Sequence, residues 1–302
     1  MPTITVLNDI HLKPAYESVV DDFRLPRGTD GVVIAGDLLD KPERDHCEQA
    51  RQLLARLDAH DVPTVYVPGN HDPLATARIV AEGFDSVELA HDRSVTGAAF
   101  DGQTVFDDVA VVGWGCTQFD AGCEIEYESA SEFAIRDEHG HVDRYRESQA
   151  SQQLLGAVDA LIDGARDVSE VRDALGLPAV ADEDLTRIRE VGTRLRDHII
   201  TPERTLVATH VPPFGTDLDR HHSAENRPMD GLHEGSLAIA GAIRATSPAF
   251  AVSGHSHVRG YGTYDAPPPH LLNGGFRGIT TVELEGDRVG FEFHTPDWLP
   301  GE

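Results

Sequence analysis

The chain has 302 residues and carries 52 aspartates and glutamates against 25 lysines and arginines, for a formal net charge of -27. Hydrophobic residues make up 40% of the sequence, enough for a buried core, so the composition excludes a wholly disordered acidic protein. The negative charge disfavours a constitutive nucleic-acid coat and docking on an anionic membrane, because both surfaces attract Lys and Arg.

Short apolar runs alternate with helical patterns in the first third of the chain. The patterns predict strands at residues 4–7, 31–35 and 64–67, with helices between them at residues 16–23 and 43–60. This alternation favours an α/β protein with βαβ units and a largely parallel central sheet. Ligands bind at the carboxyl ends of the strands in open sheets of this kind, so the polar residues that follow each strand are candidate site residues.

The sequence changes character between about residues 118 and 198, where it is rich in Glu, Asp, Arg and Gln. Apolar residues recur at helical spacing in 152–162 and 185–195, which predicts a mostly helical, exposed insertion. We expect residues 118–198 to lie within a single domain of residues 1–302. The insertion could cap a site or form an oligomer interface, and the oligomeric state stays open.

Strand patterns flank this insertion on both sides. Two short strands are predicted within residues 103–113, and further strands at 205–208 and 249–252. A helix is predicted at 236–245. The last part of the chain, residues 279–293, has the pattern of a β-hairpin.

The three cysteines, Cys47, Cys116 and Cys123, form no C-x-x-C pair, so neither a disulfide framework nor a cysteine-based zinc site is expected. The sequence contains no apolar run long enough for a transmembrane helix, and its first residues lack the pattern of a signal peptide. These features favour a cytoplasmic protein that does not bind a membrane.

Five polar clusters combine carboxylates, imidazoles and one carboxamide, and four of them directly follow a predicted strand. Nitrogen and oxygen ligands of this mixture suit first-row transition metals, whereas Ca²⁺ or Mg²⁺ alone would favour oxygen ligands. The clusters are Asp9-Ile10-His11, Gly36-Asp37-Leu38-Leu39-Asp40, Gly69-Asn70-His71-Asp72, Thr209-His210 and Gly254-His255-Ser256-His257.

The spacing within these clusters fits a shared metal site. In extended backbone, residues i and i+2 point the same way, so Asp9 with His11, and His255 with His257, can each direct two ligands to one place. Asp37 can bridge two cations with its two carboxylate oxygens. That would hold the ions about 3.5–4 Å apart, the arrangement suited to phosphoryl transfer.

The order D-x-H, G-D-x-x-D, G-N-H-D, an isolated His before Pro-Pro, and G-H-x-H resembles the calcineurin-like metallophosphoesterases. The resemblance covers about residues 3–115 and 203–295. It implies two packed mixed β-sheets flanked by helices, a four-layer α-β-β-α sandwich, with a dinuclear metal site at the strand ends.

The resemblance also implies roles for single residues. The first metal would be held by Asp9, His11, Asp37 and His257, and the second by Asp37, Asn70, His210 and His255. His71 would be the catalytic imidazole, oriented by Asp72, and both Asn70 and His71 would contact the substrate. Asp40 is expected to be a supporting carboxylate.

The expected cofactors are two divalent transition-metal ions. Manganese is the first expectation, and iron, zinc, nickel and cobalt are chemically compatible with these ligands. The resemblance implies a metal-bridging hydroxide that attacks phosphorus, with His71 as the general acid that protonates the leaving oxygen.

The expected substrate is a small phosphomono- or phosphodiester. A DNA-repair-type exonuclease of the same superfamily is an alternative, because residues 35–42 are similar to that group, but nucleic acid is not the favoured partner. A catalytically inactive interaction scaffold is a second alternative. The loop at residues 214–235 also carries candidate contacts. Arg220 and Arg227 could bind phosphate, although surface salt bridges are the simpler role for both. The histidines of this loop, His221, His222 and His233, are expected to be solvated.

The acidity has a second interpretation. Lys13 and Lys41 are the only lysines, and the carboxylates are spread along the whole chain. Such a surface is typical of a halophilic protein, since molar salt shortens the Debye length to about 3 Å and screens self-repulsion.

Overall fold

Two mixed β-sheets form the centre of this computed structural model, which describes residues 2–100, 106, 108–115, 124–125, 134–136, 142–145, 149–220, 231–264, 268–285 and 288–295. The first sheet contains β1 (Thr3–Asn8), β2 (Gly31–Ala35), β3 (Thr64–Val67), β4 (Val87–Leu89), β13 (Gly278–Glu285) and β14 (Arg288–His294). The second contains β5 (Arg93–Val95), β6 (Ala110–Trp114), β9 (Thr205–Thr209), β10 (Phe250–Ser253), β11 (Gly260–Gly262) and β12 (His270–Asn273). A separate pair is formed by β7 (Ala134–Arg136) and β8 (Val142–Tyr145).

The strand order is β14-β13-β1-β2-β3-β4 in the first sheet and β11-β12-β10-β9-β6-β5 in the second. In the first sheet β1, β2, β3 and β4 run parallel, and β13 is antiparallel to both of its neighbours, β1 and β14. In the second sheet β12, β10, β9 and β6 run parallel, and the edge strands β11 and β5 are antiparallel to them. The three strands predicted in the first third of the chain pair in parallel, as expected, but each sheet as a whole is mixed, because the β13–β14 hairpin joins β1 and short antiparallel strands extend the second sheet. The two packed mixed sheets flanked by helices are confirmed.

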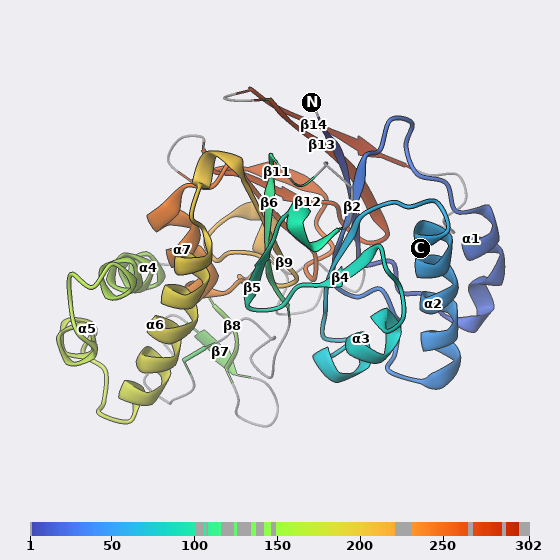
Figure 1. The fold of residues 1–302 in the computed structure, drawn as a ribbon. Coiled ribbons are helices and arrows are strands. Elements are labelled where there is room, and N and C mark those ends of the chain that lie inside the picture. The colour runs from blue at the N-terminus through green and yellow to red at the C-terminus, as the bar shows by residue number, and fades with distance from the viewer. Residues whose placement is uncertain are drawn as a thin grey trace.

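Helices cover the outer face of each sheet (Figure 1). On the first sheet lie α1 (Glu17–Asp22), α2 (Arg44–Asp58) and α3 (Leu74–Ala81). On the side of the second sheet lie α4 (Gln149–Ile162), α5 (Val168–Leu175), α6 (Ala181–His198) and α7 (Leu237–Thr246). Short 3-10 turns occur at Pro14–Tyr16, Gly97–Ala99, Pro202–Arg204 and Asp217–Asp219.

Alternation along the strands divides the apolar residues between the layers. Val33 of β2 faces the second sheet and packs in a cluster with Val65 and Leu206, whereas its neighbours Val32 and Ile34 pack beneath α2. Successive side chains of a strand point to opposite faces, so a run that is buried throughout, such as β2, serves two cores. This explains why the central strands read as continuous apolar runs.

The described part of the predicted insertion contains α4, α5 and α6 together with the β7–β8 pair, which was not expected. Helix α5 begins with a capping box formed by Asp167 and Glu170 and ends at Gly176 in the left-handed conformation. Helix α6 extends beyond the predicted 185–195 at both ends, and its buried residues Leu185 and Ile188 pack against apolar residues of α4.

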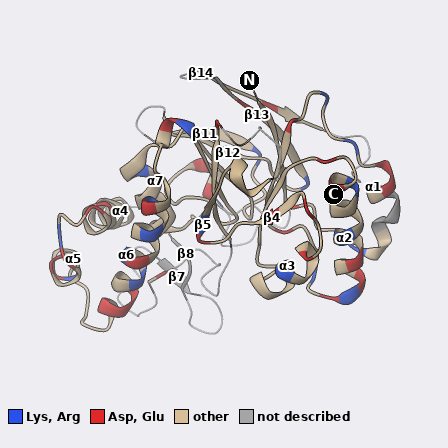
Figure 2. Ribbon diagram, in the orientation of Figure 1, with Lys and Arg blue, Asp and Glu red and all other residues tan. Residues whose placement is uncertain are grey.

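Acidic residues are distributed over helices on both sides of the sandwich (Figure 2). None of the helices in the described segments has the length and apolar character needed to cross a membrane.

Candidate metal centre

The loops that leave five parallel strands bring Asp and His side chains together at the carboxyl edge of the sheets. Three overlapping groups each place their ligand atoms within 4.8 Å of one another. They share Asp9, His11 and Asp37, so they form one cluster. The groups are Asp9, His11 and His257; His11, Asp37 and His71; and Asp9, Asp37 and His210.

Asn70 and His255 join the same cluster. Asn70 Oδ1 lies 2.8 Å from His210 Nε2 and 3.2 Å from His255 Nδ1. His210 Nε2 is also 3.4 Å from Asp37 Oδ2. The structure therefore brings together all seven side chains that the sequence indicated as ligands.

The backbone at this cluster is strained. Five of the seven candidate ligands have positive φ angles: Asp9 at 47°, His11 at 51°, Asp37 at 47°, His255 at 66° and His257 at 57°. A non-glycine residue with this left-handed backbone conformation costs about 1–3 kcal/mol, and the conformation persists only where the surrounding structure enforces it. Such residues gather at functional sites, and here each one turns a side chain inward immediately beyond a strand.

Two glycines make room for the cluster. A Cβ atom on Gly69 would lie 2.1 Å from Asp37 Oδ1, and one on Gly36 would lie 2.0 Å from His210 Nδ1. Gly36 also has a φ of 84°, which side chains disfavour. Glycine is therefore required at these two positions, because any side chain there would overlap a candidate ligand.

Burial and mutual charge shift the pKa values of the cluster in opposite directions. Burial raises the pKa of Asp9 to about 7, although His210 opposes the shift. For Asp37, burial alone would raise the pKa, but His210, His11 and His71 outweigh it and lower the pKa below its usual range. Burial lowers the pKa of His11 to about 4, so this imidazole is neutral at pH 7, as a metal ligand must be.

A family model described as calcineurin-like phosphoesterase matches residues 2–259. The chain belongs to the calcineurin-like phosphoesterase family. This family comprises metal-dependent hydrolases of phosphoric esters, so the expected family and general activity class are confirmed.

A solved structure shows the same fold at low sequence identity. One crystal structure aligns with 98% of this phosphoesterase and 100% of its own chain, at 15% identity and a TM-score of 0.53. The crystal structure of TT1561 from Thermus thermophilus aligns with 97% of this chain and 98% of its own, at 16% identity and a TM-score of 0.45. No curated protein matches the chain significantly.

The donor set of this phosphoesterase fits metal ions. Among the residues that the structure describes, neither Asp9 Oδ2 nor His11 Nε2 has a hydrogen-bond partner, although both atoms are buried. An unsatisfied buried polar atom costs about 1–3 kcal/mol, which a bound cation would offset. The cluster is open on one side, where Asn70 and His257 are exposed.

The hydrogen bonds of Asp72 go to groups other than the His71 ring. Its carboxylate accepts hydrogen bonds from the main-chain N–H groups of Gly69, Asp37 and Leu38 at 2.6–3.1 Å, and from the Tyr66 hydroxyl. It therefore ties the loop after β2 to the loop after β3. The His71 ring is instead oriented by a main-chain oxygen, that of Asp40, 2.5 Å from Nδ1.

Other residues near the cluster were not identified from the sequence. The ring of Phe276 lies 5.4 Å from that of His11 and 4.9 Å from that of His257, measured between centroids. Asn8 Nδ2 donates to the Ser253 carbonyl, and Asn273 Nδ2 donates to that of Gly254, so both asparagines brace the G-H-x-H loop. The sequence signal for both asparagines is their position at the end of an apolar strand.

The loop after β9 differs from the expectation at one residue and matches it at another. His233 is buried, with Nδ1 2.8 Å from Asp219 Oδ1, so the prediction of a solvated loop histidine is wrong for this residue. Arg220 pairs with Asp217 and donates to the Gly231 carbonyl, which matches the simpler salt-bridging role. His221, His222 and Arg227, like Cys116 and Cys123, lie outside the described residues.

Proposed function

We propose that this phosphoesterase hydrolyses a small phosphomono- or phosphodiester with two divalent transition-metal ions. The observation that carries the proposal is the single cluster of the seven candidate ligands, with two buried ligand atoms that no other group satisfies. Asp9, His11, Asp37 and His257 would hold one ion. Asp37, Asn70, His210 and His255 would hold the other, with manganese as the first candidate for both.

When bound, the two cations neutralise phosphate charge and lower the pKa of water enough to supply a nucleophile near neutral pH. The Asn70 amide would orient the phosphate by donating a hydrogen bond to one of its oxygens. His71 would protonate the leaving oxygen through Nε2, because the Asp40 carbonyl accepts the hydrogen bond from Nδ1. The side chain of His71 is 40% exposed, so a substrate can reach it.

Metal analysis and a substrate panel test this proposal. Purified protein loaded with Mn²⁺ should hold about two ions per chain, and chelation should abolish hydrolysis of phosphomonoesters or bis-aryl phosphodiesters. The panel should include single-stranded DNA and be run at low and high salt, since the exonuclease alternative predicts preferential cleavage of DNA. Fewer than one ion per chain, together with no hydrolysis of any substrate, would favour the scaffold alternative.

A further inference from the structure

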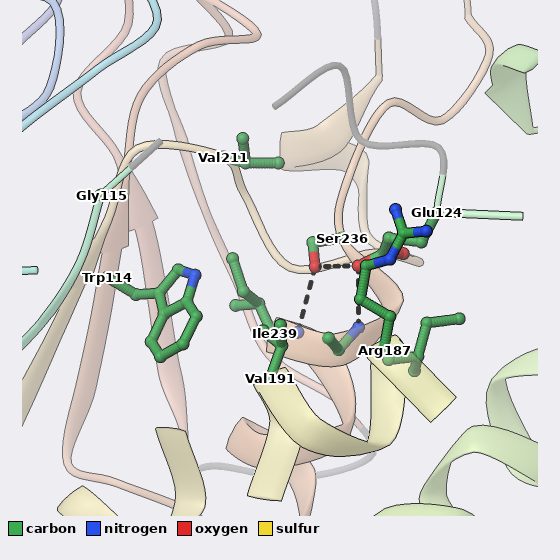
Figure 3. Close-up of a pocket in the computed structure, with 10 residues that line it drawn as sticks. Trp114, Gly115, Glu124, Arg187, Val191, Val211, Ser236 and Ile239 are labelled. Atoms are coloured by element: carbon green, nitrogen blue, oxygen red, sulfur yellow. Dashed lines mark hydrogen bonds between the residues drawn. The ribbon is translucent and has the colours of Figure 1, made fainter. Parts of the chain in front are cut away.

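The buried polar groups of this chain differ in whether the protein itself satisfies them. Figure 3 shows the Glu124 carboxylate beside helix α7, where it accepts hydrogen bonds from the Ser236 hydroxyl and from main-chain N–H groups at the start of the helix. The chain itself thus satisfies this carboxylate. At the candidate metal centre, by contrast, the buried His11 Nε2 has no hydrogen-bond partner within the part of the chain that the structure describes. Side chains that pack on the His11 ring are therefore in a position to affect a bound ion.

Phe276 is a partly exposed aromatic residue that packs on the His11 ring. The centroid of the phenyl ring lies 5.4 Å from that of His11 and 4.9 Å from that of His257, with interplanar angles of 37° and 50°. The two imidazoles are themselves 5.5 Å apart and nearly perpendicular, at 87°. Three rings thus pack against one another, and two of them belong to candidate ligands of the same ion.

The imidazoles assigned to the other ion have different surroundings. The rings of His210 and His255 pack on each other, with their centroids 5.1 Å apart. His210 Nε2 and His255 Nδ1 also lie 2.8 Å and 3.2 Å from Asn70 Oδ1. Phe276 is therefore placed to influence one of the two ions more than the other.

A tight turn presents Phe276 to these rings. Residues 274–277 link β12 of the second sheet to β13 of the first, and the Gly278 N–H closes the turn on the Gly275 carbonyl at 2.9 Å. Arg277, the third residue of the turn, has a φ of 51°, a conformation for which Gly or Asn is usual. Such strain persists only where the surrounding structure enforces it, and it is concentrated at functional sites.

The turn is hydrogen bonded to both loops that carry the two imidazoles. The Arg277 N–H donates to the Asp9 carbonyl, 3.0 Å away. Asn273 accepts from the Gly275 N–H through Oδ1 and donates to the Gly254 carbonyl through Nδ2, both at 2.8 Å, so it joins the turn to the G-H-x-H loop. The buried Arg277 guanidinium also lies 4.6 Å from the centroid of the phenyl ring. These contacts hold the phenyl ring in place without any ion.

We propose that Phe276 is a positioning residue for the ion assigned to His11 and His257. The phenyl ring would keep both imidazoles in the orientation in which they bind the ion, and it would exclude water from that side of the site. Without it, the exposed His257 imidazole would rotate more easily, and ion binding would have to immobilise it. The proposal rests on the proposed function and deepens it, because it names a residue outside the ligand set that controls the affinity for one ion.

Titration of the metal-free full chain with Mn²⁺, followed by isothermal titration calorimetry, tests the proposal. Phe276→Ala should weaken the binding of one ion about 10–100-fold, the usual effect of removing a group that orients metal ligands, and leave the other at its parental affinity. Phe276→Tyr should retain both affinities, because it keeps the ring. Phe291→Ala is the matched control, since Phe291 is also partly exposed but lies in β14 and stacks on Tyr261.

Two ligand variants identify the affected ion. His255→Ala should keep mainly the ion assigned to His11 and His257, so adding Phe276→Ala should weaken its binding by the same factor of about 10–100. His257→Ala should keep mainly the other ion, and adding Phe276→Ala should leave the affinity for that ion unchanged. The visible absorption spectrum of bound Co²⁺ reports the geometry of its ligands. It should change with Phe276→Ala and remain parental with Phe276→Tyr.

The two proposals fail in different measurements. Parental affinities for both ions in Phe276→Ala would refute the positioning role and leave the phosphoesterase function standing. Equal weakening of both ions, with a lower melting temperature of the metal-free protein, would also refute it, because that result indicates a general structural role. Weaker binding of one ion alone, absent in Phe276→Tyr, would support it. Fewer than one ion bound by the parent chain would overturn the proposed function, and this inference with it.

Discussion

The Nδ1 atom of His71 lies 2.5 Å from the main-chain oxygen of Asp40. A carbonyl oxygen only accepts hydrogen bonds, so Nδ1 carries the ring proton and Nε2 is left as the nitrogen that exchanges a proton with a ligand. His71 Nε2 is 4.0 Å from Asp37 Oδ2, at the edge of the candidate metal centre. One main-chain contact thus holds the proton on Nδ1 and leaves Nε2 as the nitrogen that can take up and release the catalytic proton.

His71→Ala should lower kcat for an alkyl phosphate about 10²–10⁴-fold, the usual contribution of general-acid catalysis. The loss should be smaller for p-nitrophenyl phosphate, because its leaving group needs little protonation. Metal content should stay at the parental value, as measured on the purified variant. His60→Ala, an exposed histidine far from the cluster, is the control. An equal loss for both substrates would argue against proton donation by His71.

Asp72→Asn should lower stability and metal affinity together, because the Asp72 carboxylate joins the two loops that present Asp37 and Asn70. An amide cannot accept all of these hydrogen bonds, and leaving buried donors unpaired costs about 1–3 kcal/mol each. Denaturant unfolding and Mn²⁺ titration measure the two effects. A variant with parental stability and metal affinity but reduced kcat would instead support direct orientation of His71.

Gly69→Ala should disrupt the metal centre, since the added methyl group would overlap the Asp37 carboxylate. We expect weaker Mn²⁺ binding and a loss of at least about 1–3 kcal/mol in the free energy of unfolding. Gly156→Ala is the matched control, because Gly156 lies inside α4 with no atom within 4 Å of the new methyl group. That control should gain about 0.5–1 kcal/mol. Identical effects of the two substitutions would contradict the packing argument.

Glu124 should make stability depend on pH. Burial raises its pKa in the folded protein from 4.5 to about 7, despite hydrogen bonds from Ser236, Leu237 and Ala238 that oppose the shift. Between these values the folded state binds more protons than the unfolded state, so the contribution of Glu124 is full below pH 4.5 and is lost as pH rises through 7.

Glu124→Gln removes this titration. The stability of the parent relative to the variant should fall by up to about 3 kcal/mol between about pH 4.5 and pH 8, measured by denaturant unfolding at each pH. Glu48→Gln, at a position 55% exposed, should show no such trend. A constant difference between the parent and Glu124→Gln would show that the buried carboxylate does not titrate in this range.

The charge of -27 predicts a strong effect of salt. Raising KCl from about 0.1 M to about 2 M shortens the Debye length from about 10 Å to below 3 Å and removes most of the repulsion between surface carboxylates. The melting temperature should therefore rise by roughly 5–10 °C, as followed by circular dichroism. An unchanged melting temperature would mean that the acidity is no adaptation to salt.

Much of the site could be predicted because each candidate ligand follows an apolar strand that is easy to recognise. The runs at β2 and β3 are buried throughout, and their bounds match the predicted 31–35 and 64–67. Parallel strands present their carboxyl ends at one edge, so the order of the motifs sufficed to bring Asp37 and Asn70 together.

The remaining features depend on contacts that periodicity does not encode. Strands β5 and β11 are three residues long, and their membership in the second sheet comes from pairing with β6 and β12. The Asp72 carboxylate accepts hydrogen bonds from main-chain N–H groups, and every residue type except proline has such a group, so the sequence does not indicate these contacts. The burial of His233 leaves no local pattern in the sequence, because its partner Asp219 lies 14 residues away.

The pairing of β1 with β13 has a consequence for how this protein is made. Thr3 lies opposite Glu283, so the edge of β1 that pairs with β13 stays open until a segment 280 residues further along the chain has left the ribosome. His255 is also synthesised 246 residues after Asp9, so the candidate metal centre is completed late. Assembly should therefore be slow and post-translational, with an exposed strand edge that a nascent chain must shield from aggregation.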